Sequence, residues 1–427
     1  MKTISIALLP GHKARVFSRS QSVARRLMLG VLEKLQYGCL RLHEGDQVMV
    51  FGQAADASDL VADIRVLDPQ LYSDLVFGGS IGAGEAYVSS HWETNNLTSV
   101  VRIFARNLPV LDRMDANQSR LGKWLLRLFH LLNRNSKTGS RKNISAHYDL
   151  GNDFFQLFLD QELMYSAAIY PSPDATLAQA AQYKLQRVCE KLQLKPQDHL
   201  LEIGTGWGGM ALYAAQHYGC KVTTTTISRE QYQHAKARVR DAGLEDRVTV
   251  LFDDYRELNG QFSKLVSIEM IEAVGHEHYD QYFSTCSALL KDDGLMLLQA
   301  ITISDQRYQN ALGSVDFIQR YIFPGGCLPC IGVIADKVMH KTDMTIMGVE
   351  EMGDQYAQTL KHWREAFMAQ LDQVRALGFD DRFIRLWEFY LSYCEGGFME
   401  RSIGTAQVLL AKPRYRSNYF SADGRTC

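Results

Sequence analysis

The chain has 427 residues, of which 46% are hydrophobic and 22% are charged, and its formal net charge is −2. These values are typical of a folded protein of two or three domains, and they exclude a global electrostatic attraction to nucleic acid. No apolar run reaches the roughly 18 residues that span a bilayer, and Pro10 interrupts the short apolar stretch at the start. We therefore expect a cytoplasmic protein that is soluble or peripheral to a membrane.

The eight cysteines are scattered through the chain, which favours reduced thiols over a disulfide framework. Cys327 and Cys330 form a C-x-x-C pair, but a second pair at zinc-binding spacing is missing from the sequence. A metal site is therefore not expected.

Residues 1–115 predict a small α+β domain. Residues 22–35, "SVARRLMLGVLEKL", have helical periodicity, and residues 39–52, "CLRLHEGDQVMVFG", alternate apolar and polar side chains about a central "EGD". The first pattern predicts a helix and the second a β-hairpin. A glycine-rich turn and another helix are expected within residues 75–107.

Residues 116–145 form a basic amphipathic linker that contains seven lysines and arginines and no acid. In a helix, Lys123, Arg127, His130 and Arg134 would form one stripe opposite a face of Leu, Trp and Phe. This pattern is typical of a helix on an anionic membrane surface. The alternative is a helix packed on its own protein, with a solvated basic stripe and then a flexible linker.

Residues 146–415 alternate strand and helix signals, which predicts an α/β domain with a parallel sheet. Residues 416–427 form a polar tail. Helices are expected at residues 208–218 and 229–243, and β-rich or apolar runs predict strands at 199–203, 221–227, 247–252, 264–269 and 294–301.

The stretch "LEIGTGWGG" (201–209) follows the first of these strands and opens a helix. Its spacing, G-x-G-x-G-G, differs from the dinucleotide pattern G-x-G-x-x-G, and no Lys-Ser or Lys-Thr of a phosphate loop follows. Glu202 lies two residues before Gly204, and E-x-G-x-G is typical of S-adenosylmethionine methyltransferases. An acid suits the ammonium of the methionine part, and glycines let the backbone approach the adenosyl part. The alternative is a tight turn required only for packing.

The strands that follow supply further candidate cofactor residues. The second strand ends without an acid for the ribose hydroxyls, and Thr226, Ser228 and Gln231 could hydrogen-bond there instead. After the third strand, Asp254 and Tyr255 lie where an adenine pocket is expected, one to bind the base edge and one to stack.

Taken together, these stretches resemble the cyclopropane fatty acid synthase family, which includes the mycolic acid cyclopropane synthases. The similarity covers about residues 20–412 and rests also on "HYDLGNDFFQLFLDQELMYS" (147–166), "IEMIEAVG" (268–275), "DFIQRYIFPGGCLP" (316–329) and "CEGGF" (394–398). It implies a Rossmann-like class I methyltransferase fold with a mostly parallel seven-stranded sheet. It also implies that the N-terminal domain serves lipid binding or dimerisation, which makes a homodimer possible.

The family resemblance implies a reaction on membrane phospholipids. The cis double bond of an unsaturated acyl chain attacks the S-adenosylmethionine methyl, and loss of a proton from that methyl closes a cyclopropane. If the proton leaves from elsewhere, the product is a methyl- or methylene-branched chain. Two further alternatives are a methyltransferase for a soluble small molecule and a non-catalytic lipid carrier.

In this family the proton acceptor is a bound bicarbonate. The resemblance assigns its contacts to the side chains of Glu272 and Tyr356 and to the backbone of Ile301. Two positions depart from the pattern: Ala167 stands for a cysteine whose backbone amide binds the anion, and Gln299 stands for a histidine. Alanine keeps the amide, but glutamine can donate a hydrogen bond without carrying charge. We therefore expect an altered bicarbonate site and leave open whether it is retained.

The remaining assignments follow from the same resemblance. Cys394 belongs to the catalytic set and, with Tyr321, Phe323 and Phe398, to the wall of an acyl tunnel. His147 and Tyr148 open the segment that covers the cofactor. The cofactor-binding set is Tyr165, Ser166, Glu202, Gly204, Gly206, Gly208, Thr226, Ser228, Gln231, Asp254 and Tyr255.

Overall fold

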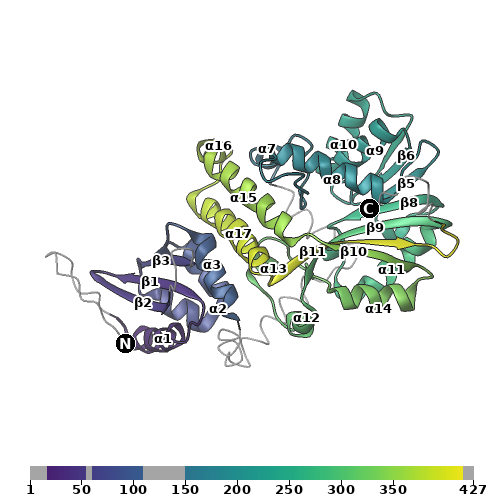
Figure 1. Cartoon of the computed structure of the whole chain (residues 1–427). Coiled ribbons are helices and arrows are strands. Elements are labelled where there is room, and N and C mark those ends of the chain that lie inside the picture. The colour runs from purple at the N-terminus through teal and green to yellow at the C-terminus, as the bar shows by residue number, and fades with distance from the viewer. Residues whose placement is uncertain (1–16, 54–59, 109–149, 417–427) are drawn as a thin grey trace.

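The computed structural model describes residues 17–53, 60–108 and 150–416. The molecule is elongated, with an N-terminal sheet and its helices at one end and a larger α/β unit at the other (Figure 1). The predictions for the segment 116–145, for His147 and Tyr148, and for the tail beyond residue 416 lie outside the described residues.

The N-terminal part contains a four-stranded sheet of order β2-β1-β3-β4. The expected hairpin is confirmed, because β1 and β2 pair antiparallel with Leu40 opposite Phe51. The sequence missed β3, which lies parallel to β1. The elements are α1 (Arg19–Leu32), β1 (Gly38–Glu44), β2 (Gln47–Gln53), β3 (Val61–Val66), α2 (Gln70–Val88), β4 (Trp92–Glu93) and α3 (Leu97–Arg106).

The glycine-rich stretch expected as a turn lies inside α2. Only Gly79 leaves helical geometry there, with φ 56° and ψ −135°, and it kinks the helix. Glycine adopts this backbone conformation at little cost, so Gly79 makes the expected turn between the two helical segments that α2 joins.

The larger unit is built on a seven-stranded sheet of order β10-β11-β9-β8-β5-β6-β7. The five strands from β9 to β7 are parallel, and β11 runs antiparallel between β9 and β10. The predicted α/β class and mostly parallel sheet are confirmed. The strands are β5 (His199–Ile203), β6 (Lys221–Thr225), β7 (Val248–Leu251), β8 (Phe262–Ile268), β9 (Leu290–Ile303), β10 (Thr345–Glu351) and β11 (Ile403–Ala411).

Helices cover both faces of this sheet (Figure 1). The helix α8 begins at Leu177 with a capping box, in which the Thr176 side chain accepts from the backbone of Gln179. The helices are α7 (Asn152–Gln156), α8 (Leu177–Lys191), α9 (Gly209–Tyr218), α10 (Arg229–Asp241), α11 (Tyr279–Leu289), α12 (Asp305–Leu312), α13 (Phe317–Tyr321), α14 (Ile331–Lys341), α15 (Gly353–Ala369), α16 (Leu371–Ala376) and α17 (Asp381–Met399), with short 3₁₀ turns at Tyr255–Glu257, Ile271–Ala273 and His276–His278.

The helix α17 connects the two parts, because it packs on α15 and also on α2 and α3. Phe317 and Phe389 belong to the same buried cluster as the N-terminal core. Gly84 of α2 allows this approach, since a Cβ at that position would lie 2.4 Å from the Phe317 ring. The Arg385 guanidinium lies 4.0 Å from the centre of the Tyr87 ring and donates to two carbonyls of the N-terminal part. The N-terminal core is therefore closed by residues of the larger unit.

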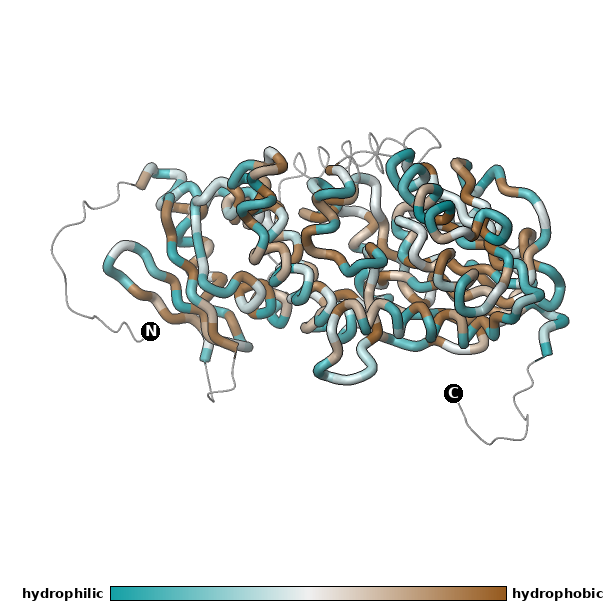
Figure 2. The backbone as a smooth tube through the Cα atoms, turned by 90° about the horizontal axis from the view of Figure 1, so that it is seen from above, coloured by the Kyte–Doolittle hydropathy of each residue, from teal (hydrophilic) through white to brown (hydrophobic). Residues whose placement is uncertain are grey.

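Figure 2 shows apolar residues distributed along both halves of the molecule. Within the described ranges, no helix combines the length and the apolar character needed to cross a bilayer.

Candidate functional site

A cavity of about 1130 Å³ runs from the carboxyl ends of the parallel strands to the N-terminal helices. Ligand sites in open α/β sheets lie at this end of the strands. Its N-terminal section is apolar and includes Met28, Leu75, Val100 and Phe104. The predicted site residues that line it are Tyr165, Ser166, Glu202, Gly204, Gly206, Thr226, Gln231, Asp254, Tyr255, Glu272, Ile301, Tyr356 and Cys394.

The glycine loop leaves room for a ligand. Gly204 and Gly206 line the cavity with φ of 102° and 53°, and a Cβ at Gly206 would meet no atom within 4 Å. Gly208 has a different role, because it caps α9 and a Cβ there would lie 3.2 Å from Ala235. Open space at Gly206 fits the close approach of the predicted adenosyl cofactor.

Glu202 presents a buried acid beside this loop. Its Oε2 accepts from Thr224 Oγ1 at 2.6 Å, and Thr224 also pairs with Thr205 at 2.7 Å. Burial raises the pKa of Glu202 to about 8. A cationic group in the cavity would favour the ionised form, as the methionine ammonium of the predicted cofactor requires.

The end of β6 brings Thr226 and Gln231 together. Thr226 Oγ1 donates to Gln231 Oε1 at 2.8 Å, so the hydroxyl fixes the glutamine amide at the cavity wall. Ser228 caps α10 by accepting from the backbone of Gln231 and does not line the cavity. Its role is to hold Gln231 in place.

Asp254 accepts hydrogen bonds from Arg256, which the sequence analysis missed. Asp254 Oδ1 accepts from Arg256 Nε at 2.8 Å, and Asp254 Oδ2 accepts from an Arg256 terminal nitrogen at 2.6 Å. Tyr255 packs its ring edge-on against Tyr282 at 5.6 Å. The expected adenine pocket therefore contains an ion pair as well as an aromatic ring.

Tyr165 and Ser166 border the cavity above a buried lysine. Ser166 Oγ accepts from Lys184 Nζ at 2.8 Å, and Lys184 has no solvent exposure. Burial lowers the Lys184 pKa to about 8, while Glu269, Asp160 and Glu202 oppose that shift. Tyr165 pairs its hydroxyl with Tyr390 at 2.8 Å. A lysine within an amphipathic helix gives no sequence signal that it is buried.

Glu269 lies at the centre of the residues predicted to bind bicarbonate. Its Oε1 accepts from the backbone amide of Ala167 at 2.9 Å and from Gln299 Nε2 at 2.8 Å. Its Oε2 accepts from Tyr356 Oη at 2.9 Å. The sequence analysis quoted this residue in "IEMIEAVG" but gave it no role. Its position directly after β8 was the available signal.

A row of hydrogen bonds fixes which end of Gln299 faces Glu269. Gln407 Nε2 donates to Gln299 Oε1 at 2.9 Å, and Lys191 Nζ donates to Gln407 Oε1 at 2.5 Å. The row starts at Lys191, whose ammonium can only donate, so Gln407 must present its oxygen to Lys191 and its nitrogen to Gln299. Gln299 therefore presents its amide nitrogen to the Glu269 carboxylate.

Glu272 contacts the other predicted group, because the Ile301 amide donates to its Oε1. Among the described residues its Oε2 has no hydrogen-bond partner. Burial, and then the charge of Glu269, raise the Glu272 pKa to about 8. Five groups were predicted to bind bicarbonate, and three of them, on Ala167, Gln299 and Tyr356, already donate to Glu269. A bicarbonate ion therefore does not fit in this arrangement.

The C-x-x-C pair supports the backbone next to Glu272. The Cys327 amide donates to the Glu272 carbonyl at 2.8 Å, and the Cys327 carbonyl accepts from Tyr279 at 2.8 Å. Cys330 is buried at the start of α14. In the part of the chain that the structure describes, no His, Cys, Asp and Glu side chains group as metal ligands.

Three of the four residues assigned to the acyl tunnel line the cavity: Phe323, Cys394 and Phe398. Phe398 stacks on the Tyr356 ring at 4.5 Å, which places the apolar wall against the Glu269 site. The expectation for Tyr321 is wrong, because its side chain is 38% exposed outside the cavity and its hydroxyl contacts Glu85.

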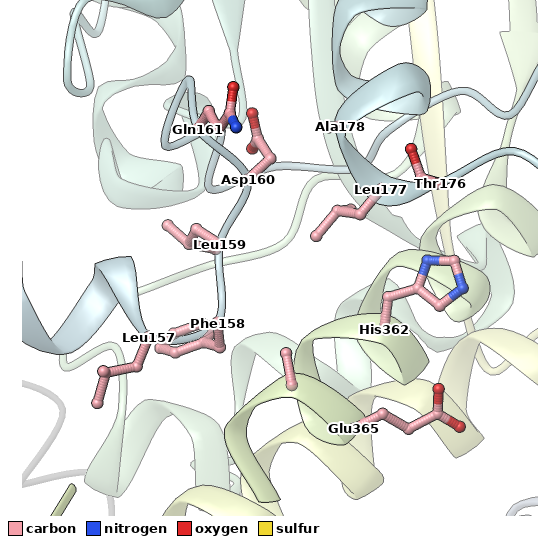
Figure 3. Close-up of a pocket in the computed structure, with 11 residues that line it drawn as sticks. Leu157, Phe158, Leu159, Asp160, Gln161, Thr176, Leu177, Ala178, His362 and Glu365 are labelled. Atoms are coloured by element: carbon pink, nitrogen blue, oxygen red, sulfur yellow. The ribbon is translucent and has the colours of Figure 1, made fainter. Parts of the chain in front are cut away.

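A second hollow of about 470 Å³ lies between the 157–161 segment, the start of α8 and α15 (Figure 3). His362 and Glu365 of α15 border it, opposite Asp160 and Thr176. None of the predicted site residues lines this hollow, so the larger cavity is the candidate active site.

Known proteins are similar to this chain in sequence and in fold. Residues 135–408 match the family model "Mycolic acid cyclopropane synthetase". The chain is 38% identical to the tuberculostearic acid methyltransferase UfaA1 of Mycobacterium tuberculosis, over 78% of this chain and 79% of the relative. It is also 38% identical to the cyclopropane-fatty-acyl-phospholipid synthase of Escherichia coli K12, over 82% and 88%.

Among solved structures, the mycolic acid cyclopropane synthase CmaA1 complexed with SAH and CTAB is similar. The TM-score is 0.60 and the identity 32%, over 64% of this chain and 98% of the other. The chain thus belongs to the mycolic acid cyclopropane synthetase family of S-adenosylmethionine-dependent methyltransferases.

Proposed function

We propose that the protein is a cyclopropane-fatty-acyl-phospholipid synthase, which transfers a methylene from S-adenosylmethionine to the cis double bond of an unsaturated phospholipid acyl chain. The observation that carries this proposal is the continuity of one cavity. The glycine loop and Glu202 border its polar end, and N-terminal apolar side chains such as Phe104 border the other. An acyl chain in the apolar section would bring its double bond to the polar end.

S-adenosylmethionine, when bound, supplies a methyl group on a positively charged sulfur. In the proposal, Glu202 balances the methionine ammonium, Gly204 and Gly206 admit the adenosyl part, and Thr226 and Gln231 bind the ribose hydroxyls. Holding the methyl in line with the alkene is a positioning task, and these contacts perform it from one side.

Aromatic side chains border the place where the double bond would react. The rings of Tyr165 and Phe323 line the cavity 6.4 Å apart, and the buried Trp363 packs 5.2 Å from Tyr165 outside the cavity lining. A positive charge on the acyl chain would face ring surfaces and would be separated from water. In the proposal, this wall keeps water from trapping the cation before a proton is lost.

The N-terminal domain contributes the far wall of the cavity, which supports its proposed role in lipid binding. A phospholipid substrate would bring the protein to the inner membrane face, where the basic pattern of residues 116–145 suits anionic headgroups. A homodimer through the N-terminal domain is part of the same proposal.

Product analysis tests the proposed function. The purified protein is incubated with S-adenosylmethionine and vesicles of a phospholipid with one cis double bond per chain, and the released acyl chains are examined by proton NMR. We expect high-field cyclopropane protons in step with S-adenosylhomocysteine release. Vinylic methylene or branched-methyl signals would instead assign the branched-chain alternative, and an unchanged lipid would contradict both.

A further inference from the structure

The groups assigned to bicarbonate already bind an anion that belongs to the protein. The Ala167 amide, the Gln299 side chain and the Tyr356 hydroxyl all donate to Glu269, at 2.8–2.9 Å. The other two groups, Glu272 and the Ile301 amide, bind each other beside it. We infer that the Glu269 carboxylate takes the place of bicarbonate and itself accepts the proton released after methyl transfer; this inference rests on the proposed function.

The replacement of histidine by glutamine at position 299 agrees with this assignment. Gln299 presents an amide nitrogen because Gln407 donates to its oxygen. An amide can donate a hydrogen bond to a fixed carboxylate, but it does not transfer a proton to that carboxylate.

The charges in the site favour an ionised Glu269. Three donors and the buried Lys184 stabilise its anion, although burial still raises its pKa above the ordinary value. The Glu272 pKa of about 8 leaves that neighbour largely protonated at pH 7. When it is ionised, a carboxylate with a raised pKa is a stronger base than an exposed one.

In the proposed reaction, methyl transfer comes before the removal of the proton. The alkene π electrons form a bond to the methyl carbon while the carbon–sulfur bond breaks, and its electron pair stays on sulfur as S-adenosylhomocysteine. The other alkene carbon becomes cationic. Glu269 takes a proton from the new methyl, and the released carbon–hydrogen pair forms the second ring bond. Glu269 then holds the proton until the product leaves, when it passes to water.

The backbone at Glu269 makes a sharp test possible. Its φ is 49°, in the left-handed region that glycine adopts freely, so Glu269→Gly removes the carboxylate without a backbone penalty. Glu269→Gln keeps the volume but removes the base. Glu269→Gly leaves space for a small anion among the three donors, whereas Glu269→Gln fills that space. Each variant is therefore the control for the other.

Cyclopropane formation in the lipid is measured by proton NMR, beside S-adenosylhomocysteine release, in CO₂-free buffer with and without about 20 mM bicarbonate, on the order of the excess that fills a weak site. We expect the wild-type rate to be the same in both, and Glu269→Gln to be slower by about 10²–10⁴-fold in both. Without bicarbonate, Glu269→Gly should be as slow as Glu269→Gln. With bicarbonate, its rate should rise by at least about tenfold. A wild-type enzyme that needs bicarbonate, or a Glu269→Gln variant with the wild-type rate, would overturn the inference.

A binding measurement keeps the test independent of turnover. Carbon-13 NMR of labelled bicarbonate should show line broadening with Glu269→Gly and none with wild type, in variants whose thermal unfolding is cooperative. Bicarbonate binding to wild type would contradict the inference even if no lipid were modified. Failure of the proposed function has a different signature, since an unmodified lipid or a branched product with wild type leaves this binding result unchanged.

Discussion

Glu202 shows what a single buried carboxyl does to stability. Its pKa of about 8 exceeds the ordinary 4.5, so the folded chain binds this proton more tightly than the unfolded chain. Between about pH 4.5 and 8 the unfolded state therefore binds fewer protons, and the free energy of unfolding falls by up to about 1.4 kcal/mol per pH unit from this group. Below that window the group is protonated in both states, and above it in neither.

Glu202→Gln removes this titration. We expect the stability of wild type relative to the variant to fall from pH 5 to pH 8 and to stay level below and above. Urea unfolding of both proteins at unit pH intervals, without cofactor, measures the difference. Parallel stability curves across that range would contradict the assignment of the raised pKa to Glu202.

At the residue scale, local sequence could predict the glycine loop but not the partners of Glu269. Gly204, Gly206 and Glu202 act within one strand and turn, and their spacing shows in the sequence. Tyr356 lies 87 positions from Glu269 and Gln299 lies 30 positions away. Only the packing of β8, β9 and α15 brings Tyr356 and Gln299 to the Glu269 carboxylate. The sequence analysis assigned a role to each residue separately, so it missed the partner that they share.

At the element scale, all five strands predicted in the catalytic part are present, because their β-branched and apolar runs are continuous. Four of them are largely buried, and the edge strand β7 is partly buried. β3 was missed because its apolar residues alternate over only six positions after a polar stretch. The turn predicted in the glycine-rich stretch is present at Gly79, where the two helical segments of α2 meet. The segment after Gly79 is helical, and Gly84 in it admits the Phe317 ring.

The contact at Gly84 gives a prediction for this interface. Gly84→Val places side-chain atoms where the Phe317 ring lies, so α2 must move away from α13 and α17. We expect a loss of roughly 1–3 kcal/mol in the free energy of unfolding, as for other overpacked sites. Gly78→Val in the same helix is the control, because a Cβ there meets no atom within 4 Å. Chemical denaturation that finds equal losses in both variants would contradict the interface role.

At the scale of the whole molecule, the two parts share one cavity, so a residue of the N-terminal domain can limit what the active site accepts. Ala105 of α3 lines the apolar section far from the glycine loop in sequence. Ala105→Trp should reduce turnover of long acyl chains by about tenfold or more, because a filled section leaves their ends without room. S-adenosylmethionine affinity should stay unchanged.

The control for this change is Ala242→Trp, since Ala242 is exposed at the end of α10. Rates for phospholipids with short and long unsaturated chains, together with calorimetric cofactor titration, measure both effects. An equal loss for every chain length, or weaker cofactor binding, would show that Ala105 acts through folding rather than through acyl-chain space.

The left-handed backbone at Glu269 has a consequence for how such an enzyme can change during evolution. Its φ of 49° costs a glutamate on the order of 1 kcal/mol and a glycine almost nothing. Glycine and glutamate codons differ by one base, and the glycine form would be the more relaxed chain. A single point mutation can therefore exchange a built-in base for dependence on dissolved bicarbonate, so selection on the reaction, and not the fold, maintains one or the other.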